Sequence, residues 1–152
     1  LVAQASMASV ADCERPGDAQ MKRMHIGVTV DDLGRSIEFY TRLFGEPPAL
    51  QRVDYAKWML DDPPLNFAIN TTGDQRTGVD HLGIQVESND ALEQVREVWD
   101  RDGLTRQDQN DLVCGYQRQD KSWVFDPQGL PWEVFVTHEV TDGYGTNDMP
   151  TS

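Results

Sequence analysis

The chain has 152 residues, of which 38% are hydrophobic and 26% are charged, a composition typical of one globular domain rather than a disordered chain. Its 26 acidic and 13 basic residues give a formal net charge of −13, which would repel phosphate-rich partners. No apolar run approaches the ~20 residues of a transmembrane helix. We therefore expect neither a nucleic-acid nor a membrane partner. Two cysteines, Cys13 and Cys114, are too few for a disulfide framework, and we expect a cytoplasmic protein.

Composition divides the chain into three segments. Residues 1–20 lack the basic and apolar regions of a signal peptide, so we interpret them as a disordered extension or one added outside the natural chain. The domain itself is expected over residues 21–140, with two repeats at about 21–73 and 78–138. Residues 141–152 are polar and contain two glycines, which predicts a loose tail.

Two segments that lie 56 residues apart share one pattern. MHIGVTV (24–30) and DHLGIQV (80–86) both place histidine second and glycine fourth, with aliphatic residues between them. Each segment alternates with period two and therefore predicts a strand. The alternation puts His25 and His81 on the face opposite the aliphatic residues of their strands. Because the aliphatic faces are expected to pack against helices, we expect both histidines to face a shared cleft.

An amphipathic helix is predicted after each of these strands. The stretch DDLGRSIEFYTRLFG (31–45) offers an aspartate as N-cap, apolar residues at helical spacing and a glycine as terminator. SNDALEQVREVWDRDG (88–103) offers the same signals, with Ser88 or Asn89 as N-cap.

The similarity continues to the end of each half. WMLDDPPLNFAIN (58–70) matches WVFDPQGLPWEVF (123–135), with Trp58 against Trp123 at an offset of 65 residues. Both segments predict antiparallel strands that are joined at proline- and glycine-containing turns. The fold class we predict is therefore α+β, with two βαβββ repeats forming a pseudo-two-fold mixed sheet around a metal cleft.

The metal is expected because four equivalent positions of the repeats hold His25, His81, Glu133 and Ala68. Glu133 falls on the strand face opposite Trp132, where a buried carboxylate needs a partner. Two imidazoles and one carboxylate are the donors of a facial triad, which leaves coordination positions open for substrate or O2. We expect this triad to bind a divalent metal, with Fe(II) favoured and Mn, Co, Ni or Zn as alternatives.

The structural alternative is that these histidines and Glu133 are ordinary polar groups with satisfied hydrogen bonds. His138 lies past the last predicted strand and is expected at the surface. Cys114 is either a buried thiol or a soft donor near the metal, and its position in a mostly polar strand does not decide between the two. Four aromatic residues are expected first as core or cleft lining and only second as substrate contacts: Tyr55, Trp58, Tyr116 and Trp123.

The paired βαβββ pattern with ligands on matching strands resembles the glyoxalase/bleomycin-resistance/extradiol dioxygenase superfamily, the vicinal oxygen chelate fold. More narrowly, four stretches resemble the cadmium-induced protein and organoarsenical C–As lyase group over about residues 21–138: KRMHIGVTVDDLGRSIEFYTRLFG, DYAKWMLDDPPLNFAI, VDHLGIQVES and QDKSWVFDPQGLPWEVF. The resemblance implies an arsenic-resistance enzyme of dioxygenase or lyase type. Such an enzyme would use nonheme Fe(II) and O2 as co-substrate to break the carbon–arsenic bond of trivalent organoarsenicals. Its metal ligands would be His25, His81 and Glu133.

The same group carries a vicinal Cys-Cys pair that holds trivalent arsenic, followed by Tyr or Phe and a downstream Asp-Lys. The matching stretch in this chain is Cys114-Gly115-Tyr116 with Asp120-Lys121, so one of the two thiols is absent. The resemblance implies that Cys114 binds the substrate and that Cys114 and Tyr116 take part in catalysis.

Two other functions stay open. One is different chemistry of the same superfamily, either extradiol ring cleavage or glyoxalase-like isomerisation. Ala68 cannot coordinate a metal, which disfavours a four-ligand glyoxalase, and ring cleavage would need a His or Tyr acid–base near the open positions. The other is non-enzymatic binding of a metal ion or drug, which the presence of all three ligand types disfavours. The partner we expect is a small-molecule substrate, and a homodimer is the one assembly we consider.

Overall fold

The computed structural model describes residues 22–71, 76–146 and 149–151, so the N-terminal extension lies outside the described residues. Its helices and strands, in chain order, are β1 (Arg23–Thr29), α1 (Leu33–Phe44), β2 (Leu50–Gln51), β3 (Tyr55–Asp61), β4 (Pro64–Asn70), β5 (Gly78–Val86), α2 (Asn89–Arg101), β6 (Gln107–Cys114), β7 (Gln117–Phe125) and β8 (Pro131–Val140). The element order is thus strand, helix and three strands, twice over.

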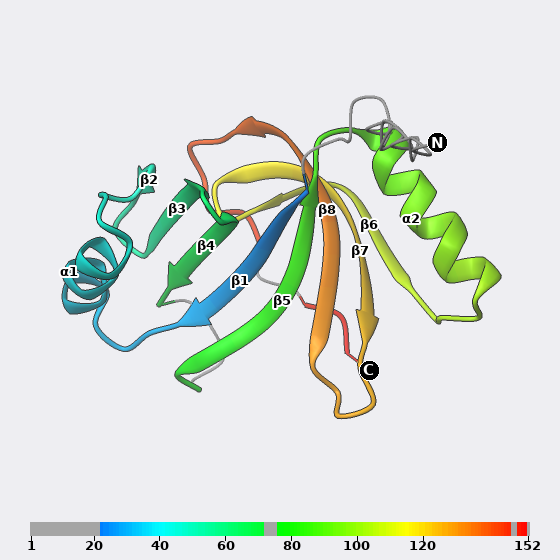
Figure 1. Cartoon of the computed structure of the whole chain (residues 1–152), viewed down its shortest axis with the longest axis horizontal. Helices are drawn as coiled ribbons and strands as arrows, with labels where there is room; N and C mark the ends of the chain where they lie inside the picture. Colours follow the sequence, from blue (N-terminus) through cyan, green and yellow to red (C-terminus); the bar gives the residue numbers. More distant parts are fainter. Residues whose placement is uncertain (1–21, 72–75, 147–148, 152) are drawn as a thin grey trace, which may run out of the picture.

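All these strands form one mixed sheet in the order β2-β3-β4-β1-β5-β8-β7-β6. The two repeats occupy opposite halves of the sheet and meet where β1 pairs antiparallel with β5. Each first strand pairs in parallel with the last strand of its own repeat, β1 with β4 and β5 with β8. The sheet is strongly curled, and the two helices lie at its opposite ends (Figure 1). The predicted α+β fold of two βαβββ repeats is confirmed.

The helices begin and end where the capping signals predict. The Asp32 side chain accepts a hydrogen bond from a backbone N–H of the first turn of α1, and Ser88 does the same in α2. Gly45 ends α1 in the left-handed conformation, with φ 77°. The C-cap of α2 is Asp102, and Gly103 follows it with φ 77°.

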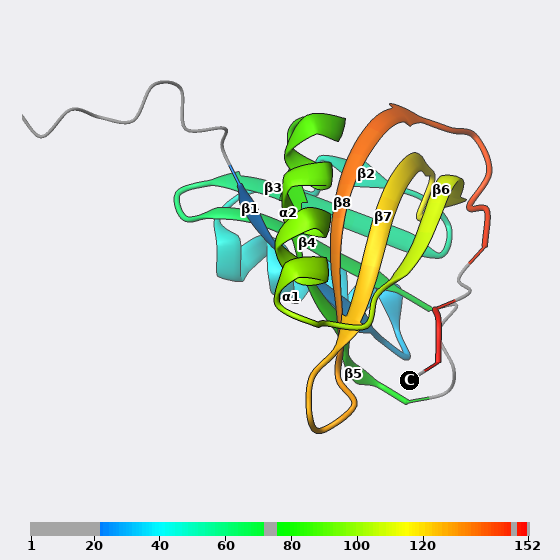
Figure 2. The ribbon, with the colours of Figure 1, turned by 90° about the vertical axis from the view of Figure 1, so that its right-hand side faces the viewer.

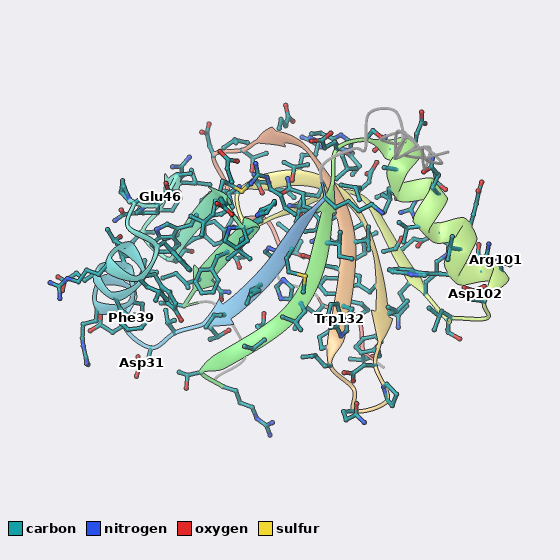
Figure 3. All side chains as sticks on the ribbon, in the orientation of Figure 1. Asp31, Phe39, Glu46, Arg101, Asp102 and Trp132 are labelled. Carbon is teal, nitrogen blue, oxygen red and sulfur yellow. The ribbon has the colours of Figure 1, made fainter. Side chains whose placement is uncertain are left out.

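Each repeat buries its own apolar face beneath its own helix. The first core combines residues of β1, β3 and β4 with the apolar side of α1: its buried members are Val28, Ala56, Trp58, Phe67 and Ile69. The second core joins β5 and β8 to α2: its buried members are Val86, Ala91, Leu92, Val134 and Val136. Phe39 of α1 lies on the outside of the molecule (Figure 3), and its side chain is 60% exposed. The other, inner face of the sheet is therefore left to the polar residues of β1 and β5.

The sequence match of Trp58 with Trp123 is out of register in the structure. Trp58 belongs to the core beneath α1, whereas Trp123 pairs with Glu133 and lines a cavity on the inner face. The residue that occupies the place of Trp123 in the first repeat is Lys57, which pairs with Ala68. A shift of one residue moves a side chain to the other face of a strand, so the two tryptophans serve different faces.

The tip of the β6–β7 hairpin reaches across the inner face to the start of β3. The Tyr116 hydroxyl donates a hydrogen bond to Asp54 Oδ1 over 2.5 Å, and Gly115 lies against Tyr55. Figure 1 shows this hairpin in yellow, arching toward the half of the sheet that contains β3 and β4. The hairpin thereby joins two distant parts of the curled sheet.

The described part of the C-terminal tail lies beside β6 (Figure 2). The backbone N–H of Thr146 donates to the Val113 carbonyl over 2.9 Å, and Gly145 forms a β-bridge with Cys114. Its polar composition predicted a loose segment and did not indicate these contacts. Among the residues that the structure describes, neither helix has the length and apolar character needed to cross a membrane.

Candidate active site

The three side chains predicted as metal ligands meet on the inner face of the sheet. His25 lies on β1, His81 on β5 and Glu133 on β8. The antiparallel register sets His25 opposite Gly83 and His81 opposite Gly27, so the two histidines are related by the pseudo-two-fold axis between β1 and β5. Gly83 pairs on its other side with Glu133, which places the carboxylate next to the histidine pair.

The distances between the donor atoms fit one divalent metal ion. The Nε2 atoms of His25 and His81 are 3.0 Å apart. Glu133 Oε1 lies 3.3 Å from His25 Nε2 and 3.4 Å from His81 Nε2. Ligands bound about 2.1 Å from a metal are about 3.0 Å apart at octahedral angles and about 3.4 Å apart at tetrahedral angles. His25 and Glu133 are buried and His81 is half-buried, which suits a site shielded from bulk water.

The remaining nitrogen of each imidazole has a partner that orients the ring. His25 Nδ1 lies 3.0 Å from the Asn66 carbonyl, and His81 Nδ1 lies 3.2 Å from Asp80 Oδ2. Because both acceptors hold a proton on Nδ1, Nε2 is the atom left to coordinate a metal.

The two histidines differ in charge. Burial lowers the pKa of His25 to about 4, so this imidazole is neutral, as a metal ligand must be. Burial also acts to lower the pKa of His81, but its hydrogen bonds to Asp80 and Glu133 outweigh that effect and raise the pKa to about 9. A metal that binds here therefore displaces a proton from His81.

Lys121 on β7 is a site residue to which the sequence analysis gave no role of its own. It is 3% exposed, and its Nζ donates to Glu133 Oε2 over 2.8 Å. Burial would raise the pKa of Glu133, but Lys121 and His81 outweigh it and hold the pKa well below its usual range. The ion pair occupies Oε2, so Glu133 presents only Oε1 to the imidazoles. The alternation of inner-face residues along β7 was the signal that could have identified Lys121.

Cys114 lines the same cavity as the three predicted ligands. Ala68 lines it as well, at the place in the first repeat that Glu133 occupies in the second, because Gly27 pairs with Ala68 as Gly83 pairs with Glu133. The register therefore confirms that the fourth position of the repeat carries a side chain without a donor atom.

Tyr116, which was predicted to be catalytic, donates its hydroxyl hydrogen bond to Asp54 Oδ1. The tyrosines that line the cavity together with Cys114 are Tyr55 and Tyr144. In this arrangement Tyr116 holds the hairpin tip, and its catalytic role stays a prediction. His138 pairs over 3.1 Å with Asp120 and is partly exposed, away from the predicted ligands.

The glycine of each repeat motif is explained by the neighbouring ligand. A Cβ atom on Gly83 would lie 2.6 Å from Glu133 Cγ, too close for any residue other than glycine. We expect Gly83→Ala to displace Glu133 and to weaken metal binding by about 10–100-fold, the usual effect of disturbing the support of a ligand. Calorimetric titration of the metal-free protein measures the affinity. Gly143→Ala is the control, because a Cβ there meets nothing within 4 Å, and wild-type affinity in Gly83→Ala would contradict the proposed ligand set.

A curled sheet of two βαβββ repeats, with a buried His-His-Glu set on its inner face, defines a class of small-molecule enzymes built on duplicated units. Residues 22–134 match the family described as the Glyoxalase/Bleomycin resistance protein/Dioxygenase superfamily, and the chain belongs to this superfamily. The solved structure of an extradiol ring-cleaving dioxygenase from B. fuscum has the same fold, with a TM-score of 0.59 at 15% identity. The match covers 81% of this chain and 34% of that one.

The curated relatives bring the comparison closer. The chain is 40% identical over 130 residues to a trivalent organoarsenical cleaving enzyme of Bacillus sp., a match that covers 84% of this chain and 80% of that protein. It is also 40% identical over 117 residues to a protein of the same name from Thermomonospora curvata, covering 76% and 78%. The cadmium-induced protein CadI of Mycobacterium bovis is 31% identical over 126 residues, 83% of each chain. This chain is therefore an enzyme of the glyoxalase superfamily.

Proposed function

We propose that this enzyme cleaves the carbon–arsenic bond of small trivalent organoarsenicals in a reaction that depends on Fe(II) and O2. The observation that carries the proposal is the cavity that Cys114 shares with His25, His81 and Glu133. Thiolate is a soft donor and suits trivalent arsenic, whereas the imidazole and carboxylate set suits Fe(II). The names of two relatives, both trivalent organoarsenical cleaving enzymes at 40% identity, support the same substrate class.

Each group of the cavity has a defined task in this proposal. Cys114 anchors the arsenic, while His25, His81 and Glu133 hold Fe(II). When bound, Fe(II) supplies the activation of O2 at the coordination positions that the three ligands leave open. Lys121 keeps Glu133 ionised, so the carboxylate is available for the metal without loss of a proton.

Aromatic rings shield the ion pair of Lys121 and Glu133 from water. The Lys121 ammonium lies 5.3 Å from the centre of the Trp123 ring and 5.6 Å from that of Phe135. Exclusion of water strengthens the electrostatic interactions inside the site.

The glyoxalase-like alternative is less well supported, because Ala68 offers no fourth ligand. Since Cys114 has to stay reduced, we propose the cytoplasm as the compartment.

Oxygen uptake with two substrates tests the proposal. The protein is loaded with Fe(II) without oxygen and then given O2 with methylarsenite or with catechol. We expect O2 consumption and release of inorganic arsenite with methylarsenite, and no O2 consumption with catechol. Cys114→Ser should reduce this turnover by at least about 100-fold and leave Fe(II) binding unchanged, because the residue is not among the metal donors. Cys13→Ser is the matched thiol control, because Cys13 is the other cysteine of the chain and lies outside the described residues.

Two outcomes would contradict the proposal. One is methylarsenite turnover that survives in Cys114→Ser. The other is O2 consumption with catechol alone, which would point to extradiol ring cleavage instead.

A further inference from the structure

The cavity contains a tyrosine hydroxyl next to Cys114 that the proposed function does not use. Tyr55, the first residue of β3, is only 6% exposed and lines the cavity together with Cys114. Its ring packs against those of Tyr116 and Tyr144, with centroid distances of 5.9 and 6.2 Å. Burial and the neighbouring Cys114 raise the pKa of Tyr55 far above its usual value, so the phenol keeps its proton and can donate it.

The Tyr55 hydroxyl has no hydrogen-bond partner within residues 22–71, 76–146 and 149–151, whereas that of Tyr116 is bonded to Asp54. The Tyr55 oxygen is also not among the fully buried side-chain atoms that lack a partner, so it keeps accessible surface, and its residue lines the cavity. The hydroxyl is therefore placed to donate to a molecule that enters the cavity.

Gly115 makes room for this phenol. A Cβ on Gly115 would lie 3.3 Å from Tyr55 Cε2 and 3.4 Å from Tyr55 Oη, so a larger side chain would extend into the space of the ring. Gly115 also has φ 59°, in the left-handed region that favours glycine. The C–As lyase group that the sequence resembles has a second cysteine where this chain has Gly115. Here the phenol of Tyr55 fills the space beside that glycine.

We propose that Cys114 and Tyr55 form a site with one thiol and one phenol, which binds an arsenical through a single S–As bond and donates a hydrogen bond to its remaining As–OH. The inference rests on the proposed function and defines its substrate as an organoarsenous acid, R–As(OH)2. The Cys114 S–H bond and one As–O bond break, the S–As bond forms, and the thiol proton leaves with the hydroxyl as water. Arsenic stays trivalent, and its second hydroxyl remains to accept from Tyr55.

Native mass spectrometry of the metal-free protein tests this binding mode without any turnover. Cys13→Ser is used as the background, so that Cys114 is the single thiol in the chain. With methylarsonous acid we expect a 1:1 adduct heavier than the protein by the mass of the acid less one water. Cys114→Ser should abolish the adduct. An adduct that has lost two waters would overturn the proposal, because no As–OH would remain for Tyr55.

The role of the phenol is measured by titration of the same background protein. Tyr55→Phe should weaken formation of the adduct by about tenfold, the usual effect of one hydrogen bond in a buried site. Tyr40→Phe is the matched control, because Tyr40 belongs to α1 and packs against Phe67 on the other face of the sheet. Equal affinity in Tyr55→Phe and the background would overturn the inference.

These outcomes separate the inference from the proposed function. Normal adduct formation without O2-dependent turnover would refute carbon–arsenic cleavage and leave the binding site standing. Turnover of methylarsenite at the wild-type rate and affinity in Tyr55→Phe would refute the site and leave the cleavage standing.

Discussion

Replacement of Lys121 by methionine is expected to lower the free energy of unfolding of the metal-free protein by about 3 kcal/mol or more. Lys121 and Glu133 are each 3% exposed and are joined over 2.8 Å, so the change leaves a buried carboxylate without its main counter-charge. Methionine keeps most of the volume of the lysine stem, which limits the loss to the charge itself. Denaturant unfolding followed by circular dichroism measures the difference.

The double variant Lys121→Met/Glu133→Leu provides the control. Removal of both charges should restore part of the lost stability, because the cost arises from the unpaired carboxylate rather than from the absence of lysine. A bound divalent metal should also stabilise Lys121→Met more than it stabilises the wild type, since it supplies positive charge beside Glu133. Wild-type stability in Lys121→Met would show that the ion pair does not hold Glu133 in place.

Replacement of Ala68 by glutamate is expected to tighten metal binding by at least about tenfold, or about 1.4 kcal/mol, and to lower O2-dependent turnover by at least about 100-fold. Ala68 occupies the place in the first repeat that Glu133 occupies in the second. A carboxylate there adds a fourth ligand and fills one of the coordination positions that the reaction needs. Calorimetric metal titration and oxygen uptake measure the two effects.

Ala68→Leu separates coordination from crowding. It adds a side chain of similar size without a donor atom beside Tyr55 and Tyr116, which pack around this position. It should slow turnover without tightening metal binding. Wild-type metal affinity in Ala68→Glu would show that this position is not equivalent to that of Glu133.

The sequence by itself determined the repeat, the capped helices and the three proposed metal ligands. A strand alternates with period two whatever its surroundings, so the motif shared by residues 24–30 and 80–86 was enough to place His25 and His81 on one face. The alternation along the last predicted strand led to Glu133, and the offset between the repeats then led from it to Ala68, an equivalence that the register reproduces.

Only the tertiary structure decided which side chains surround those ligands. The one-residue shift between the hairpins, which puts Trp123 in the cavity and Trp58 beneath α1, could not be read from the matching letters. Tyr55 and Cys114 are 59 positions apart and meet because the sheet curls until the β6–β7 hairpin reaches β3. Such curling results from twist and from packing summed over the whole sheet, and local periodicity contains no information about it.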